Sequence, residues 1–322
     1  MKYITLGKSD LLVSRVAFGT WQLGGDWGAT DTEAATLAIR LAAESGVNFF
    51  DTAQAYGFGA SEELLASALR GLAREEFVIA TKGGLRPEGS GVTRDASATW
   101  IREGVESSLR ALDTDHIDLY QVHWPDPKTP FEETAEALAK LVADGKIRHV
   151  GVSNFDAKQM ETFSVTLPVE TLQPVYHIFR REIEDEILPY TRAHDVGVLV
   201  YGPLAHGLLG GNLGLDTRFA PDDWRATSSV FKGQAFEHNL KKVDELKEFA
   251  QGELGVTIGQ LAVAWTLANP SVHVAIVGTR NPNHVQEALA AADLVLDEET
   301  KSRIDDIIRD VVPVSGPSPE TV

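Results

Sequence analysis

The sequence predicts a single (β/α)8 barrel, and three observations support that fold class. First, short apolar runs alternate with stretches of helical pattern along the 322 residues, which favours a parallel sheet with right-handed crossovers. Second, there are eight such runs, and eight units in this length favour a closed barrel over a doubly wound sheet. Third, reactive side chains follow several of the runs, and barrel active sites lie at the carboxyl ends of the strands. Residues 1–310 are predicted to form one domain.

The elements follow in order along the chain. Residues 4–6 and 11–13 flank a polar turn, which predicts a small β-hairpin ahead of the barrel. Asp31 is a typical helix N-cap and Gly46 a typical helix end, so a helix is expected between the first two barrel strands. The eight barrel strands are expected at residues 16–18, 47–50, 77–81, 117–122, 148–152, 172–175, 198–201 and 274–277.

The regular spacing is interrupted once. Residues 202–233 are rich in Gly, Asp, Arg and aromatic residues without a clear period, and so long a loop in a compact domain is usually functional or disordered. It follows the seventh strand, so it is expected to lie over the barrel mouth. Extra helices are expected at residues 239–254 and 257–268. The tail, residues 311–322, contains several Pro and Gly residues and is expected to be disordered.

The composition argues against several classes of function. The formal net charge is −18 and the pI about 4.9, so nucleic acid would be repelled. There is no Cys, which excludes disulfides and thiolate metal sites, and no metal site is predicted. No signal-peptide run and no membrane-spanning segment of ~18 apolar residues is evident. We therefore expect a cytoplasmic protein that acts on a small molecule; its oligomeric state is not predicted.

Four reactive side chains lie at or just beyond the ends of three successive predicted strands: Asp51, Tyr56, Lys82 and His123. Each alone would be interpreted as a turn former, a rim residue or a structural histidine. In a parallel barrel, however, the four converge on one mouth.

Their chemistry is mutually consistent. An ammonium favours the phenolate form of a neighbouring tyrosine, and an aspartate paired with that ammonium holds the charge in place. A neutral histidine can orient a carbonyl oxygen. The set is suited to protonating an oxygen that becomes an alkoxide, and a nicotinamide cofactor is the natural hydride donor.

The segment 51–62, Asp-Thr-Ala-Gln-Ala-Tyr-Gly-Phe-Gly-Ala-Ser-Glu, resembles the signature of the aldo-keto reductases. The contexts Ala-Thr-Lys at 80–82 and Gln-Val-His at 121–123 resemble that family too. The resemblance runs from residue 19 to about residue 289, which is nearly the whole chain. The resemblance implies an NADPH-dependent (β/α)8 barrel that reduces aldehydes and ketones to alcohols. It implies Tyr56 as the general acid, Asp51 and Lys82 as its tuning pair, and His123 as the carbonyl-orienting group. The long loop after strand seven resembles the branch that includes bacterial oxidoreductases and potassium-channel β subunits.

The resemblance also implies a cofactor site built from several loops. Ser153, Asn154 and Gln173 would hold the nicotinamide carboxamide, and Tyr201 would stack on the nicotinamide face. Arg280 could pair with the 2′-phosphate of NADPH. The full expected cofactor set is Gly19, Thr20, Trp21, Asp51, Ser153, Asn154, Gln173, Tyr201, Gly202, Pro203, Leu204, Gly278, Thr279, Arg280, His284 and Glu287.

Three positions depart from the family pattern near the adenosine end. Asn212 stands where the family often has Lys, His284 where it often has Gln, and Ala288 where it often has Asn. Each change removes or alters a polar contact, which leaves the margin for NADPH over NADH open. Arg225 is a candidate to replace a lost contact.

Trp21, Phe58 and Trp124 are expected to form an aromatic wall of the substrate pocket, which suits a carbonyl compound with an apolar or aromatic group. Rim packing is the alternative interpretation of these aromatics. Two other functions stay open. One is a redox-sensing regulatory subunit that binds cofactor with little turnover, and the other is a barrel aldolase in which Lys82 forms a Schiff base.

Overall fold

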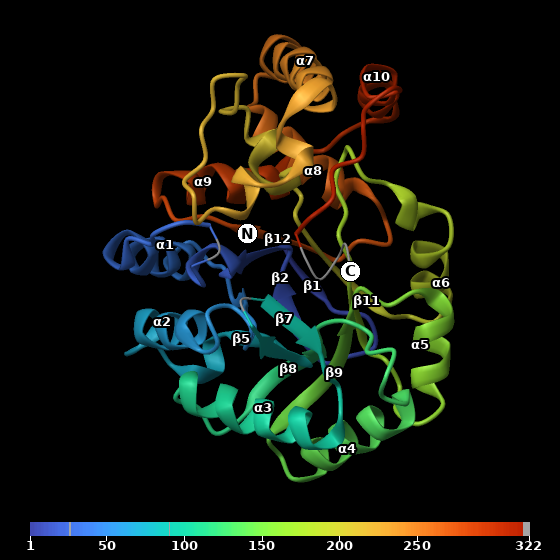
Figure 1. The fold of residues 1–322 in the computed structure, drawn as a ribbon. Helices are drawn as coiled ribbons and strands as arrows, with labels where there is room; N and C mark the ends of the chain where they lie inside the picture. Colours follow the sequence, from blue (N-terminus) through green and yellow to red (C-terminus); the bar gives the residue numbers. More distant parts are fainter. Residues whose placement is uncertain (26, 90, 318–322) are drawn as a thin grey trace.

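Eight parallel strands close into a barrel, as the sequence predicts (Figure 1). The computed structural model describes residues 1–25, 27–89 and 91–317. Around the barrel the strand order is β10-β11-β12-β3-β4-β5-β8-β9. The strands are β3 (Val16–Gly19), β4 (Phe49–Asp51), β5 (Val78–Gly83), β8 (Ile117–Val122), β9 (Ile147–Ser153), β10 (Thr171–Gln173), β11 (Gly197–Tyr201) and β12 (Val274–Gly278).

The strand register brings the ends of the strands to one level. Asp51 pairs with Gly19 on one side and with Ala80 on the other. Lys82 pairs with Gln121. Because side chains alternate along a strand, Asp51, Lys82 and Gln121 all point into the barrel near the carboxyl ends of their strands. This end of the barrel carries the polar groups of the site.

The barrel floor is closed by the predicted hairpin, β1 (Tyr3–Thr5) and β2 (Leu12–Ser14). Leu6 and Leu11 are buried in one apolar cluster with barrel residues such as Leu119. The turn of this hairpin approaches the barrel closely. A Cβ at Gly7, where φ is +56°, would lie 2.3 Å from the backbone nitrogen of Gly197 at the start of β11. Only glycine fits at this position.

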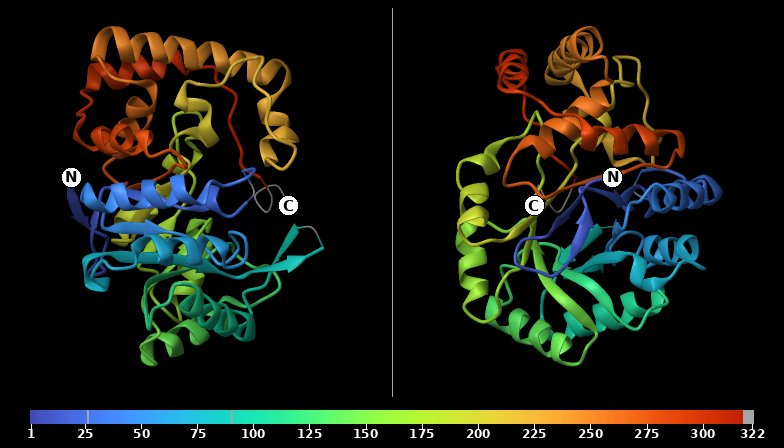
Figure 2. Two further views of the ribbon diagram at one scale, coloured as in Figure 1. Left: turned by 90° about the vertical axis from the view of Figure 1, so that its left-hand side faces the viewer. Right: turned by 180° about the vertical axis from the view of Figure 1, so that it is seen from behind.

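Helices surround the barrel (Figure 2). Two larger apolar clusters fill the space between helices and strands. Asp31 caps the first helix by accepting two backbone hydrogen bonds, as expected. The helix expected at residues 239–254 begins earlier, at Gly233, and forms α7 (Gly233–Phe249). A π-helical turn, Ala250–Leu254, follows it directly. The helices are α1 (Thr32–Glu44), α2 (Ala60–Leu69), α3 (Ala98–Ala111), α4 (Phe131–Ala143), α5 (Ala157–Ser164), α6 (Ile187–Ala193), α7 (Gly233–Phe249), α8 (Ile258–Ala268), α9 (Asn283–Ala290) and α10 (Glu298–Ile307).

A second hairpin, β6 (Leu85–Glu88) and β7 (Gly91–Arg94), follows β5 and was not predicted. It projects from the barrel in the left view of Figure 2. The long loop after β11 lacks regular helices but contains short 3-10 turns at Ala205–Gly210, Trp224–Ala226 and Ser229–Phe231.

Part of the predicted tail lies against the outer helices. Val314 is fully buried in the apolar cluster between the barrel and the outer helices. The Asn239 side chain fixes Val312 with two hydrogen bonds of 2.9 Å, one to its carbonyl and one from its N–H. Residues 311–317 therefore contact the outer helices in part, and a side chain of α7 supplies hydrogen-bond partners to their backbone. Residues 318–322 lie outside the described residues.

Within the described ranges, no helix combines the length and the apolar character needed to cross a membrane.

Candidate active site

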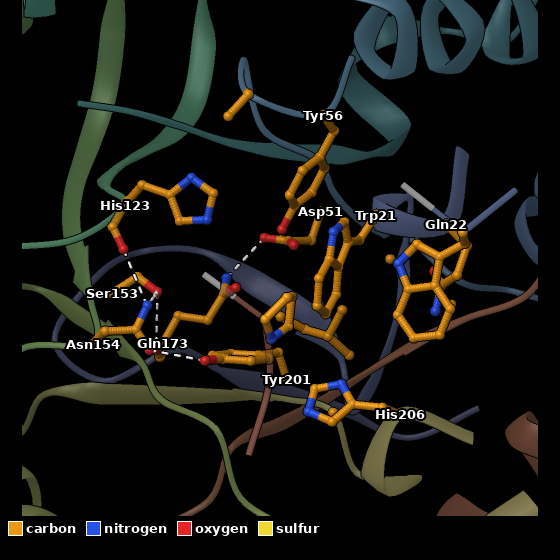
Figure 3. Close-up of a pocket in the computed structure, with 18 of the residues that line it drawn as sticks. Trp21, Gln22, Asp51, Tyr56, His123, Ser153, Asn154, Gln173, Tyr201 and His206 are labelled. Atoms are coloured by element: carbon orange, nitrogen blue, oxygen red, sulfur yellow. Dashed lines mark hydrogen bonds between the residues drawn. The ribbon is translucent and has the colours of Figure 1, made fainter. Parts of the chain in front are cut away.

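A pocket opens at the carboxyl ends of the strands, and Figure 3 shows the side chains that line it. Most of the predicted site residues meet there. Lys82 lies directly beneath it, almost fully buried. The predicted residues that line the pocket are Gly19, Trp21, Asp51, Tyr56, His123, Trp124, Ser153, Asn154, Gln173, Tyr201, Gly202, Pro203, Leu204 and Gly278.

Lys82 is the centre of the acid–base set. Its Nζ donates hydrogen bonds to Asp51 Oδ1 at 2.7 Å, to the Thr52 carbonyl at 2.8 Å and to the Tyr56 hydroxyl at 3.3 Å. Burial lowers the pKa of Lys82, and the charge of Asp51 opposes that shift. The Lys82 amine thus lies between a carboxylate and a phenol.

Tyr56 reaches this position because the loop after β4 folds tightly against the loop after β3. A Cβ at Gly24 would lie only 2.7 Å from the Tyr56 carbonyl carbon, so a side chain there would displace the tyrosine. Trp21 stacks on the Tyr56 ring at 6.2 Å between centroids. His123 meets the same ring edge-on at 5.8 Å.

His123 is held in its neutral form. Burial, together with the nearby charge of Lys82, lowers its pKa well below the usual value. Its Nδ1 atom is buried and has no hydrogen-bond partner within the described part of the chain. A neutral imidazole at the pocket wall can orient a carbonyl oxygen by hydrogen bonding without adding charge.

The three expected carboxamide contacts are linked to one another and to the acid–base set. Ser153 Oγ donates to the Gln173 carbonyl at 2.8 Å, and Asn154 Nδ2 donates to the His123 carbonyl at 3.1 Å. Gln173 Nε2 donates to Asp51 Oδ2 at 2.8 Å. The Tyr201 hydroxyl donates to Asn154 Oδ1 at 3.0 Å, which fixes the ring at the pocket wall.

The loop after β11 is strained where it borders the pocket. Ala205 and His206 both have positive φ, of 47° and 55°. Such backbone costs about 1–3 kcal/mol per residue and often marks functional sites. Burial lowers the pKa of His206 to about 3, so this ring is neutral too.

Three loops meet at the outer end of the pocket. Arg280 Nη1 donates to the carbonyls of Trp27 and Ala29, each at 3.0 Å. Arg225 lies 4.6 Å over the Trp27 ring and forms an ion pair with Asp223 at 2.6 Å. Both arginines therefore lie where the loops after β3, β11 and β12 come together.

Arg280 and the other remaining predicted residues lie outside the pocket lining. Phe58 is 43% exposed, so it does not contribute to the aromatic wall. Thr20 is fully buried and bonds to the Asp51 carbonyl. Thr279 and His284 each contact Asn281, and Glu287 accepts a hydrogen bond from Thr257 at the start of α8. Asn212 is exposed.

Several pocket residues were missed by the sequence interpretation. Leu85 and Val92 come from the unpredicted hairpin, and Gly316 and Pro317 come from the tail. No local pattern identifies these four. Gln22, Trp27 and His206 follow strand ends closely and could have been found by extending the same rule along those loops.

Comparison with solved structures places this protein in the class of oxidoreductases with a (β/α)8 barrel. A glycerol dehydrogenase from Gluconobacter oxydans aligns with a TM-score of 0.87 and 40% identity over 99% of this chain and 98% of that one. An aldo-keto reductase from Bacillus halodurans, in its holo form, aligns with a TM-score of 0.80 and 28% identity over the full length of both chains.

The chain belongs to the aldo/keto reductase family, whose model matches residues 15–309. The aldo-keto reductase YhdN of Bacillus subtilis (strain 168) is 38% identical over 97% of this chain and 95% of its own length. An NADH-specific methylglyoxal reductase of Escherichia coli (strain K12) is 35% identical over 92% of this chain and 95% of its own. A probable voltage-gated potassium channel subunit beta of Oryza sativa subsp. japonica is 34% identical over 96% of this chain and 97% of its own.

Proposed function

We propose that this protein reduces an aldehyde or ketone to an alcohol with a hydride from NADPH, and that Tyr56 is the general acid. The observation that carries the proposal is the position of the Lys82 ammonium. It lies 2.7 Å from the Asp51 carboxylate and 3.3 Å from the Tyr56 hydroxyl, at the base of the pocket. An ammonium at this place stabilises a phenolate and so makes the phenol a stronger acid.

The surrounding residues are chemically compatible with a nicotinamide cofactor. Amide and hydroxyl groups of Ser153, Asn154 and Gln173 gather at one wall, next to the Tyr201 ring. Farther out, the buried His206 Nε2 lacks a partner within the described residues, as an atom that awaits a ligand would. The bound cofactor would supply the hydride.

The protein would then handle the proton. Neutral His123 would hold the substrate oxygen by a hydrogen bond, near the Tyr56 hydroxyl. Tyr56 would donate its proton to that oxygen as it gains negative charge, and Lys82 would stabilise the resulting phenolate. The hydride and the proton together convert the carbonyl to a hydroxyl.

We propose NADPH as the preferred cofactor because Arg280 lies beside the pocket, in contact with the backbone of Trp27, which lines it. A guanidinium can form charge-assisted hydrogen bonds with a 2′-phosphate that NADH lacks. Its Nη1 is used to hold the backbone of the loop after β3, so the same residue would join loop and cofactor. The relative named as NADH-specific makes this preference a point for direct measurement.

The substrate would be a small carbonyl compound with an apolar group. Trp21, Trp124, Leu85 and Val92 supply apolar surface to the pocket, from three different loops. Such a lining favours aldehydes with aliphatic or aromatic substituents over charged ones.

The test measures, by absorbance, how fast the protein consumes reduced nicotinamide nucleotide in the presence of each member of a panel of aldehydes. NADPH oxidation that depends on both enzyme and aldehyde supports the proposal. Tight NADPH binding with no turnover across the panel would instead support the alternative, a redox-sensing regulatory subunit; two plant relatives are named as probable voltage-gated potassium channel subunits beta.

A further inference from the structure

We propose that Gln173 is a positioning residue that couples the carboxamide end of the cofactor site to the acid–base set through Asp51. The inference rests on the proposed function. Asp51 is held at both oxygens from different sides of the barrel. Lys82, on β5, donates to Oδ1 at 2.7 Å, and Gln173, at the end of β10, donates to Oδ2 at 2.8 Å. Figure 3 shows the Gln173 side chain extending to Asp51 across the pocket.

The position of Gln173 is fixed from its backbone. The Gln173 carbonyl accepts hydrogen bonds from Ser153 Oγ at 2.8 Å and from the Asn154 N–H at 3.2 Å. Its side chain is buried, and a longer contact of 3.5 Å joins its Nε2 to Gln121 Oε1. The amide therefore has little freedom to leave Asp51.

The chemistry of an amide explains the coupling. An amide side chain has a donor end and an acceptor end. With Nε2 donating to Asp51, the carbonyl Oε1 is the end suited to accept an N–H of the cofactor carboxamide. A single side chain would then connect the cofactor head group with the carboxylate that holds Lys82. The neighbouring Asn154 makes a parallel link, because its Nδ2 donates to the His123 carbonyl at 3.1 Å.

The consequence for acid strength has a definite sign. A donated hydrogen bond disperses the negative charge of a carboxylate. Without the bond, more of that charge acts on Lys82 and on the adjoining phenol, which disfavours the phenolate. Tyr56 should then lose its proton at higher pH, and it should be a weaker acid for the carbonyl oxygen.

The other charged and titratable groups around Asp51 affect the same pH profile. Lys82 faces it from β5, Tyr56 from the loop after β4, and His123 from the end of β8. Glu62, buried on α2, acts on Lys82 from behind the strand layer. The test therefore compares variants that leave all four unchanged.

The experiment compares Gln173→Met with Ser153→Ala, each at saturating NADPH. Both remove one expected carboxamide contact, but only Gln173→Met removes the bond to Asp51. We expect Gln173→Met to lower kcat about tenfold and to move the alkaline limb of its pH profile upward by about one unit, the size expected for one hydrogen bond to a charged group. Ser153→Ala should raise the KM for NADPH without moving that limb.

A second measurement needs no turnover. The ionisation of Tyr56 is measured from absorbance as the pH is raised. The titration curve of the matching Tyr56→Phe variant is subtracted from that of the protein with Tyr56, which leaves the signal of Tyr56 alone. This difference titration is done once in the wild-type background and once in the Gln173→Met background. We expect ionisation at higher pH when Gln173 is replaced.

Unchanged ionisation of Tyr56, or a uniform loss of kcat with an unshifted pH profile, would overturn the inference. Absence of carbonyl reduction by the wild type would count against the proposed function alone, because the absorbance titration is still interpretable.

Discussion

Replacing Lys82 with Met tests the centre of the site. The substitution keeps the approximate length of the side chain but removes the ammonium. Three hydrogen bonds are lost, to Asp51, to the Thr52 carbonyl and to the Tyr56 hydroxyl. Because both members of the ion pair are almost fully buried, no solvent is available to replace the charge.

The expected effect on turnover follows from the geometry. At 3.3 Å between Nζ and the phenol oxygen, the attraction between an ammonium and a phenolate is about 5 kcal/mol for an effective dielectric constant of about 20. Asp51 cancels part of this attraction. General acid catalysis typically contributes about 10²- to 10⁴-fold, so we expect kcat for carbonyl reduction to fall by about that range.

The same change should also weaken the fold. Removing Lys82 leaves the Asp51 carboxylate buried without its partner, and breaking a buried pair costs about 3–5 kcal/mol. The double variant Asp51→Asn with Lys82→Met removes both charges. It should regain most of the free energy of unfolding, because a neutral amide is less costly to bury, while kcat stays low.

The assay measures kcat with a reactive aldehyde at saturating cofactor, and the free energy of unfolding by urea titration. Lys140→Met is the matched control, since Lys140 is exposed on α4 far from the site and should tolerate the change. If Lys82→Met keeps more than a tenth of wild-type kcat, the assigned role is wrong. If the double variant recovers turnover together with stability, the loss was one of folding and not of acid strength.

Three further predictions concern other parts of the molecule. Tyr56→Phe should retain cofactor binding, measured by tryptophan quenching, but lose most carbonyl reduction; near-normal turnover would contradict the acid role. Arg280→Ala should weaken NADPH binding by ~1–3 kcal/mol and leave NADH binding almost unchanged, whereas equal losses would exclude a 2′-phosphate contact. His149, bonded to Glu170 at 2.7 Å and to Asp10 at 2.8 Å, has a raised pKa, owing first to the Glu170 hydrogen bond. Its contribution to stability should be fully present below about pH 6.5 and be lost as the pH rises through the folded-state value. Urea unfolding across pH should show this dependence in the wild type and not in His149→Gln; parallel curves would refute it.

The barrel and most of the site could be predicted from local sequence. The eight strands were predictable because most of them are apolar runs buried on both faces, and burial of that kind is visible in a single short segment. Asp51, Tyr56, Lys82 and His123 could be found because a parallel barrel brings all its strand ends to one mouth. Position along a strand is a local property, so no contact had to be known.

The hairpin β6–β7 illustrates what local pattern cannot predict. Its residues are mostly exposed or half-buried, and Pro87 lies within one of its strands. Strand signals depend on apolar alternation, and Pro argues against a strand away from an edge. The pocket contacts of Leu85 and Val92 followed only from the folded arrangement.

The packing of the tail and the contact between Gln173 and Asp51 both join parts of the chain that lie far apart in sequence. Val312 is bonded to Asn239, which lies 73 residues earlier in the chain, and the tail's own composition does not indicate this contact. Gln173 was predicted to contact cofactor, but its bond to Asp51 joins residues 122 positions apart. Neighbours along the chain determine which segments are buried and where strands end. Which polar atoms then pair across the barrel depends on strand register and closure, and these exist only once the whole barrel has formed.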